Sequence, residues 1–380
     1  MSAPEIHGHC PDRFSAVRAA FTANFVDPIP GLQEVGARFT VCRAGEPVID
    51  LWAGHADLAG TRPFTATTLT LVFSTGKAVM AVLMAGAVER GRLAYEERIA
   101  DLWPAFGAAG KDWITVGQML SHQAGLPGFD GPVDPEIWHD RPAALARLAA
   151  QAPMWPPGEG SGYHPVTGGL LAGEVFRLAE GRSLGEALRR DWAEPFALDL
   201  WLGLPEGEDA RVAQLRKPSA APDLGTLDAI KRAAFLDRGS APGPRESGPW
   251  RRMELASVNL HGTAHGLARL MGAVANGGVL DGRSLLSPGV LAQALRERSW
   301  GPDRVLPFTL SWGAGFMRNK GPGIFGPNPA AVGHCGWGGS CAFADPATGV
   351  SAAYVMTRQS PHLIGDPRAQ RLIAALYEGF

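Results

Sequence analysis

The chain has 380 residues, of which 46% are hydrophobic and 19% charged, as in a globular protein with a substantial core. Its formal net charge of −2 lacks the excess of basic side chains that nucleic acid or an anionic membrane surface attracts, so we expect neither partner. The first residues do not resemble a signal peptide, and the most apolar run, residues 78–88, is about half as long as a membrane span. We therefore expect a cytoplasmic protein.

The first predicted elements are a short helix over residues 14–24 and two strands over residues 37–41 and 47–52. The Ala-Gly-Glu turn between the strands is typical of a β-hairpin. The strongest helical pattern follows at residues 75–90 and ends at Gly91.

Residues 100–250 read as helical segments separated by loops rich in proline and glycine. Within them, residues 218–249 have little periodicity and are expected to form a long surface loop. Another helix is predicted over residues 262–276. The last third of the chain then has three predicted strands and a helix, at residues 311–317, 341–344, 349–357 and 367–378.

Strands at both ends of the chain with helices between them indicate an α+β fold. We predict one sheet domain built from residues 1–66 and 255–380, with a mostly helical domain of residues 67–254 inserted into it and the active site at their interface. The chain shows no internal repeat and no low-complexity tract.

Ser74 and Lys77 form an SxxK motif at the start of the helix predicted over residues 75–90. Residues three apart share a helix face, so the two side chains are expected to lie together. A serine hydroxyl needs a base to take its proton, and desolvation in this apolar helix would lower the pKa of Lys77 from about 10.4 towards neutrality. The motif therefore predicts a nucleophilic serine with a lysine base, at a helix N-terminus that offers N–H groups to an oxyanion.

The SxxK pair also has a purely structural interpretation, in which the serine caps the helix and the lysine reaches the surface. Two observations weigh against it. Lys77 is the only one of the five lysines that lies three residues after a serine, and its neighbours are apolar.

Other catalytic motifs in the chain are incomplete. A P-loop around Lys77 would need a glycine at position 71, which is occupied by Leu71. The GxSxG motif around Ser183 would need a preceding strand, but residues 173–180 look helical, so we interpret Ser183 as a helix cap. The cysteines show no CxxC spacing, and His7, His9 and Cys10 have no second cluster to complete a metal site. We expect free thiols, no metal and no cofactor.

Tyr163 is the only tyrosine that follows a loop rich in glycine and proline, just before a helix expected to start near Thr167. Such loops often carry function. A phenol beside a lysine ammonium would have a lowered pKa and could exchange protons with it, which makes Tyr163 a candidate second base. The alternative is a tyrosine that packs the loop.

A third candidate element is the glycine-rich segment 333–340, Gly-His-Cys-Gly-Trp-Gly-Gly-Ser, which precedes a predicted strand. Glycines let the main chain approach a ligand closely. A strand beside the nucleophile could therefore supply the second N–H group of an oxyanion hole.

These three elements, in this order, resemble the serine β-lactamase and penicillin-binding-protein superfamily. The nearest branch is the class C-like one that includes the family VIII carboxylesterases. The resemblance covers about residues 35–357 and extends to Gln118-Met-Leu-Ser-His-Gln-Ala-Gly-Leu-Pro127 and to Leu260-His-Gly-Thr-Ala264. It implies a β-lactamase-like fold, in which helices flank an antiparallel sheet.

The resemblance also implies roles for individual residues. Ser74 matches the acylated nucleophile, Lys77 its base partner and Tyr163 the tyrosine of the YxN motif. One alignment places Trp337-Gly-Gly339 where β-lactamases have KTG and makes the N–H groups of Ser74 and Ser340 the oxyanion hole. The other places His334-Cys-Gly336 there and gives the second role to Trp337. The candidate substrate-binding residues are Trp337, Gly338, Gly339, His334, Gln123, Trp155 and Phe129.

Two departures from the family pattern bear on the substrate. Tyr163 is followed by His164-Pro165, so the asparagine of YxN is missing, and neither alignment offers the KTG lysine. In the family those groups contact the amide and the carboxylate of a β-lactam. Their absence favours neutral esters.

Together, the motifs predict a serine carboxylesterase that hydrolyses short-chain carboxylic esters through an acyl-enzyme on Ser74. The expected partner is therefore a small-molecule ester substrate. One alternative is a β-lactamase or a D-amino-acid peptidase or amidase on the same scaffold. An alternative of another class is a catalytically silent ligand-binding protein, against which the intact Ser74, Lys77 and Tyr163 argue.

Overall fold

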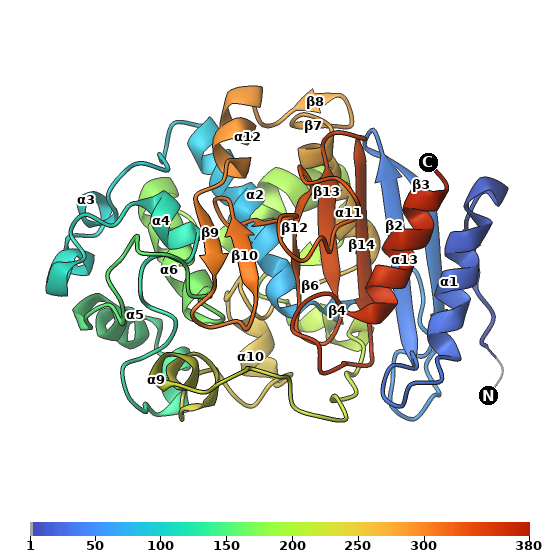
Figure 1. Ribbon diagram of the computed structural model, residues 1–380, viewed down its shortest axis with the longest axis horizontal. Coiled ribbons are helices and arrows are strands. Elements are labelled where there is room, and N and C mark those ends of the chain that lie inside the picture. The colour runs from blue at the N-terminus through green and yellow to red at the C-terminus, as the bar shows by residue number, and fades with distance from the viewer. Residues whose placement is uncertain (1–2) are drawn as a thin grey trace.

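The computed structural model describes residues 3–380 and shows an antiparallel sheet between two layers of helices (Figure 1). Helices α1 (Ser15–Phe25) and α13 (Pro367–Glu378) pack together on one face of the sheet. Helices α2 (Gly76–Glu89) and α11 (Ala264–Ala275) belong to the core on the other face. The predicted α+β class, with helices flanking an antiparallel sheet, is confirmed.

The main sheet has nine strands in the order β1-β3-β2-β14-β13-β12-β11-β10-β9. Their bounds are β1 His7–His9, β2 Gly36–Arg43, β3 Glu46–Gly54, β9 Ser299–Pro302, β10 Thr309–Trp312, β11 Met317–Arg318, β12 Val332–Cys335, β13 Cys341–Asp345 and β14 Val350–Met356. The N-terminal strand β2 pairs with the C-terminal strand β14 along its length. The sheet therefore joins strands from both ends of the chain.

The central strands β13 and β14 are buried on both faces, and the side chains of β14 alternate between the two cores. In β14, Ala352 and Tyr354 face the core of α1 and α13, whereas Ala353 and Val355 face the core of α2 and α11. Successive side chains of a strand point to opposite faces. A strand covered on both sides can therefore be apolar at successive positions, which explains the apolar run 352–356 of β14.

The remaining elements surround this sheet. The other α-helices are α3 Ile99–Leu102, α4 Val116–Leu120, α5 Arg141–Ala150, α6 Thr167–Glu180, α7 Leu184–Ala187, α8 Glu194–Phe196, α9 Ala229–Lys231, α10 Gly248–Arg252 and α12 Pro288–Leu295. Short strands β4 Thr70–Leu71, β6 His261–Gly262 and β5 Leu200–Trp201 form a second sheet, and β7 Val279–Leu280 pairs with β8 Arg283–Ser284. Single turns of 3₁₀ helix are common; η2, Phe73–Thr75, leads directly into α2.

Helix α2 is apolar around its whole circumference, because it is enclosed by other elements. It contacts α6, α7, α11, α12 and β12. Twelve of its fourteen residues are buried. Its end at Glu89 is followed by Gly91 at a φ of +65°, which matches the predicted stop.

Two predicted elements were wrong in detail. The strand expected over residues 311–317 is two strands of a hairpin, β10 and β11, because the chain turns at Gly315 with a φ of +84°. The stretch 218–249, expected to be a surface loop, contains α9 and a π-helical turn η7, Arg232–Leu236, with Ala233 and Ala234 buried. Its apolar residues lack a regular period, so the sequence pattern did not reveal that they pack inward.

The predicted division into two domains stays a prediction. All strands of the nine-stranded sheet lie within residues 7–54 and 299–356. One hydrophobic core nevertheless joins α2 and α6 of the predicted helical part to α11 of the predicted sheet part. Across residues 3–380, every helix is too short or too polar to cross a membrane.

Candidate active site

The 3₁₀ turn η2 places Ser74 immediately before α2. Phe73, the preceding residue, has a φ of +47°, which is a strained conformation for a side chain other than glycine. The Phe73 ring packs edge-on against Trp337, with 5.6 Å between the ring centroids. Strain of this kind persists only where surrounding contacts hold it, so the packing of Phe73 fixes the main chain that carries Ser74.

Lys77 connects the serine with the tyrosine predicted to work with it. Its Nζ lies within hydrogen-bond distance of Ser74 Oγ, at 3.2 Å, and of Tyr163 OH, at 2.8 Å. It also donates to the main-chain oxygens of Pro165 at 2.8 Å and Ser257 at 3.3 Å. The Ser74 hydroxyl in turn lies 3.2 Å from the oxygen of Ser257. The structure therefore brings the three predicted catalytic side chains into one hydrogen-bonded group.

The surroundings of Lys77 favour its neutral amine. The side chain is 1% exposed, and burial lowers its pKa well below the usual lysine value. Among residues 3–380, no acidic side chain pairs with it to offset this shift. A neutral amine at hydrogen-bond distance from Ser74 Oγ has the geometry and the protonation state of a general base.

The expected lowering of the pKa of Tyr163 was wrong. Burial raises the pKa of Tyr163 above its usual value, and the charge of Asp303 adds to the shift, while a hydrogen bond with Ser74 opposes it in part. The expectation assumed a lysine ammonium beside the phenol. Because Lys77 is itself desolvated, that charge is disfavoured. Tyr163 therefore remains a neutral phenol, which keeps a proton that it can donate.

Aromatic side chains hold the Tyr163 ring in place. Trp312 stacks on it with centroids 5.8 Å apart, and His122 and His334 lie at 4.9 and 5.9 Å. Burial lowers the pKa of His122 well below its usual value and that of His334 to about 3, so both imidazoles are neutral. The phenol is thus oriented by uncharged rings and by Lys77.

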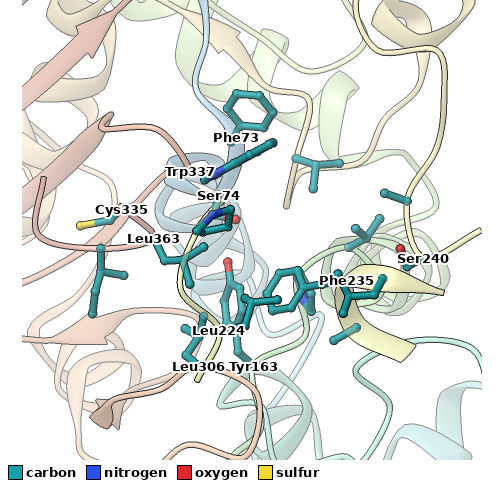
Figure 2. A pocket seen from close by; sticks show the side chains of 18 of the residues that line it. Phe73, Ser74, Tyr163, Leu224, Phe235, Ser240, Leu306, Cys335, Trp337 and Leu363 are labelled. Atoms are coloured by element: carbon teal, nitrogen blue, oxygen red, sulfur yellow. The ribbon is translucent and has the colours of Figure 1, made fainter. Parts of the chain in front are cut away.

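A cavity of about 260 Å³ opens above Ser74 and Tyr163 (Figure 2). In the figure, Tyr163 points its hydroxyl towards Ser74, Phe73 and Trp337 stand above the serine, and Phe235 and Ser240 lie across the opening. Most of the far wall belongs to the stretch expected to be a surface loop, with Ala221, Pro222, Leu224, Ala234, Phe235, Leu236, Ser240, Ala241 and Pro242. The lining is predominantly apolar, as in sites that bind small organic molecules.

Two of the seven predicted substrate-binding residues, His334 and Trp337, line this cavity. The other five do not. Gln123 is buried with its amide donating to Ser121 Oγ and to the oxygen of Arg298. Phe129 and Trp155 are core residues, which pack on Trp138 and His164 respectively.

Gly338 and Gly339 belong to the loop that carries Trp337 but are not among the residues that line the cavity. A Cβ on Gly338 would meet Gln359 at 2.7 Å, and a Cβ on Gly339 would meet the side chain of Arg368 at 2.6 Å. The absence of side chains at these two positions lets the loop pack closely against Gln359 and Arg368. Their predicted contact with substrate stays a prediction.

The geometry distinguishes the two candidates for the second oxyanion N–H. Neither the N–H of Trp337 nor that of Ser340 has an acceptor within residues 3–380. Trp337 lines the cavity together with Ser74, whereas Ser340 is 1% exposed and its hydroxyl donates to the oxygen of Val72. A Cβ on Gly336 would meet that same oxygen at 2.2 Å, so Gly336 lies directly against the main chain that leads to Ser74. This arrangement favours the alignment that gives the oxyanion role to Trp337.

The structure adds residues that the sequence did not single out. The main-chain oxygens of Pro165 and Ser257 orient Lys77, and carbonyl groups have no sequence signature. Arg245 lines the cavity beside Trp337. The competing serine, Ser183, caps α7 by accepting from the N–H of Glu186 and follows a helix, so it does not form a nucleophile elbow. Within residues 3–380 there is no group of three metal-ligating side chains.

The family follows from comparison with known proteins. The family described as Beta-lactamase matches residues 22–376 of the sequence. The chain belongs to the beta-lactamase family. It is a serine hydrolase of the esterase branch of the serine β-lactamase and penicillin-binding-protein superfamily, which confirms the resemblance seen in its motifs.

Individual relatives of this beta-lactamase-family chain cover nearly its whole length. It is 35% identical to the esterase/beta-lactamase LipL of Mycobacterium tuberculosis, over 95% of this chain and 85% of LipL. A penicillin-binding protein homologue from Caulobacter crescentus has 54% identity and a TM-score of 0.96, with 99% of this chain and 100% of that one covered. The structure of a family VIII carboxylesterase has 38% identity and a TM-score of 0.91, with the same coverage. The β-lactamase-like fold is thereby confirmed.

Proposed function

We propose that this serine hydrolase is a carboxylesterase that cleaves short-chain carboxylic esters through an acyl-enzyme on Ser74. The observation that carries the proposal is the position of Lys77. Its buried Nζ lies within hydrogen-bond distance of Ser74 Oγ and of Tyr163 OH, and these two side chains line a mainly apolar cavity. A lysine held neutral beside a serine hydroxyl is suited to nucleophilic catalysis.

The acylation step follows from this geometry. Neutral Lys77 takes the proton of Ser74, and Oγ attacks the carbonyl carbon of the ester. The N–H groups of Ser74 and Trp337 stabilise the negative charge on the carbonyl oxygen. The proton on Lys77 then passes through the Tyr163 hydroxyl to the departing alkoxide, which leaves as an alcohol and completes the ester between the acyl group and Ser74.

Deacylation uses the same groups in the reverse direction. Water attacks the acyl carbon while its proton moves through Tyr163 to Lys77. The collapse of the second oxyanion intermediate breaks the bond to Ser74 Oγ, which recovers the proton, and a carboxylic acid is released. Every proton transfer uses side chains of this chain, without a bound metal or organic cofactor.

An acyl donor that turns over slowly tests the proposal. Intact mass after incubation should increase by the mass of one acyl group in the wild type and remain unchanged in Ser74→Ala. Ser183→Ala, a matched control in a helix cap, should be acylated like the wild type. A mass increase that survives in Ser74→Ala would refute the assignment.

Substrate preference distinguishes the carboxylesterase from the alternative activities. LipL is named as both an esterase and a β-lactamase, so β-lactam hydrolysis is the second candidate activity. The position of the KTG lysine is taken by His334, a neutral imidazole, which supports ester over β-lactam hydrolysis. We expect p-nitrophenyl butyrate to be cleaved faster than nitrocefin. Rapid nitrocefin turnover without ester cleavage would overturn the assignment of carboxylesterase activity. A fluorophosphonate probe that fails to label Ser74 would instead indicate a catalytically silent binding protein.

A further inference from the structure

Arg245 is the one charged side chain that lines the active-site cavity within residues 3–380. It is exposed to solvent and lines the cavity, so it lies at the cavity rim. Its guanidinium carbon lies 4.8 Å from the centroid of the Trp337 ring. Cations are attracted to the face of an indole, so Trp337 holds the arginine over the opening.

Arg245 has no anionic partner in the protein. Among residues 3–380 it takes part in no ion pair and no side-chain hydrogen bond, although Glu246 is its neighbour in the chain. By contrast, Arg251 and Arg252, a few residues further on, both pair with Asp209. Partial burial lowers the pKa of Arg245 from its usual value. The guanidinium nevertheless stays charged at neutral pH, because arginine is not deprotonated in proteins under these conditions. The cavity therefore presents a charged, planar donor with unfilled hydrogen-bonding capacity.

The arginine is connected to the reacting centre through two aromatic rings. Phe73 precedes Ser74, Trp337 packs against Phe73, and Arg245 lies over Trp337. Figure 2 shows Phe73 and Trp337 together above Ser74. An ester whose carbonyl carbon meets Ser74 Oγ thus extends past Trp337 before it reaches Arg245. A group that binds Arg245 must lie several bonds from the scissile carbonyl.

We infer that Arg245 forms a carboxylate-binding subsite and that the substrates are esters with a carboxylate remote from the bond that is cleaved, such as half-esters of dicarboxylic acids. A guanidinium matches a carboxylate with two parallel hydrogen bonds. The apolar wall from residues 221–242 accommodates the carbon chain between the two groups. This inference rests on the proposed esterase function and narrows its substrate class.

Matched substrate pairs test the subsite. We expect the ratio of kcat/KM for mono-p-nitrophenyl adipate to that for p-nitrophenyl hexanoate to fall about tenfold or more in Arg245→Ala, and further in Arg245→Glu. Arg245→Lys should retain part of the preference, since it keeps the charge and loses the planar fork. A second pair, 4-carboxyphenyl hexanoate and phenyl hexanoate, shows whether the carboxylate belongs to the alcohol instead of the acid. Equal ratios in wild type and Arg245→Ala for both pairs would overturn the inference.

Arg283→Ala is the matched control. Arg283 is also exposed, lies over an aromatic ring with its guanidinium carbon 5.0 Å from the centroid of Phe196, and does not line the cavity. Its removal should leave both ratios at the wild-type value. A fall in this variant equal to that in Arg245→Ala would assign the effect to the net charge of the protein and overturn the subsite.

Binding measurements separate this inference from the proposed function. Calorimetry on Ser74→Ala protein, with and without Arg245→Ala, should show hexanoate binding that depends on Arg245 and hexanamide binding that does not. If the wild type cleaves none of the esters but hexanoate binding still requires Arg245, the esterase proposal fails and the subsite stands. If hexanoate and hexanamide bind alike in both proteins, the subsite fails.

Discussion

The side chain of Arg368 donates a hydrogen bond of 2.8 Å from Nη2 to the main-chain oxygen of Gly338. A residue of the C-terminal helix thus holds the loop that carries Trp337. Arg368 is fully buried and forms ion pairs with Asp366 and Glu34. Burial of Glu34 raises its pKa to about 7, against the opposing charge of Arg368.

Replacement of this arginine should therefore affect both folding and catalysis. Arg368→Met would leave buried carboxylates without their cation, and we expect the free energy of unfolding to fall by about 3–5 kcal/mol. Denaturant unfolding measures the loss, and kcat with p-nitrophenyl butyrate reports on the loop. The control is Arg296→Met, which breaks an exposed ion pair with Glu96 and should change stability by less than about 1 kcal/mol. Equal losses in the two variants would contradict a special role for Arg368.

Removal of the Lys77 amine should abolish most of the activity. We expect Lys77→Ala to lower kcat for p-nitrophenyl butyrate by roughly 10³-fold, because general-base catalysis contributes about 10²–10⁴. Lys111→Ala removes another fully buried lysine, whose Nζ donates to the oxygens of Ala108 and Gln151 away from the cavity. It should destabilise the protein and leave kcat close to the wild-type value. A Lys77→Ala enzyme that keeps more than a tenth of wild-type kcat would show that another group is the base.

The activity should depend on pH in a direction set by Lys77. Burial lowers its pKa, and the proposed mechanism uses its neutral form as the base. We therefore expect kcat/KM to rise as the pH increases through this lowered pKa and to level off well below 10.5. Because burial also raises the pKa of Tyr163, the phenol should not ionise in that range. The pH profile of p-nitrophenyl butyrate hydrolysis measures this, since the substrate has no titrating group. A rise that occurs only near pH 10.5 would contradict a desolvated lysine.

The hydroxyl of Tyr163 should matter for rate more than for stability. Tyr163→Phe keeps the ring stacked on Trp312 and removes the oxygen that lies 2.8 Å from Lys77 Nζ. We expect kcat to fall by about 10²-fold with little change in melting temperature. Tyr95→Phe is the control, because the buried Tyr95 hydroxyl has no partner within residues 3–380. If Tyr163→Phe retained full kcat, proton transfer through the phenol would be excluded.

Gly336 should tolerate no side chain. A Cβ there would come within 2.2 Å of the Val72 oxygen and of Ser340 Oγ. Gly336→Ala should therefore push the Trp337 loop away from Ser74 and lower kcat by about 10²-fold or more, the effect expected for loss of an oxyanion donor. Gly289→Ala, where nothing lies within 4 Å, should leave kcat near the wild-type value. Wild-type kcat in Gly336→Ala would argue against Trp337 as the donor.

Elements with strong local signals could be predicted from the sequence. The C-terminal helix begins at Pro367 and ends at Glu378, as expected from its proline start and apolar period. The starts of α2 at Gly76 and of α6 at Thr167 also agree with the predicted helices, whose apolar patterns extend over several turns. The break between β10 and β11 was missed, because the tight turn at Gly315 interrupts a run that is apolar on both sides.

The sequence by itself determined the family, the α+β class and the SxxK motif with its candidate tyrosine, because these depend on residue identity and short spacing. The tertiary structure decided the properties that depend on burial and on contacts between distant segments. These include the raised pKa of Tyr163, the placement of Trp337 rather than Ser340 at the cavity, and the cavity wall formed by residues 221–242. Desolvation and long-range packing sum over atoms from many segments, so no local pattern in the chain encodes them.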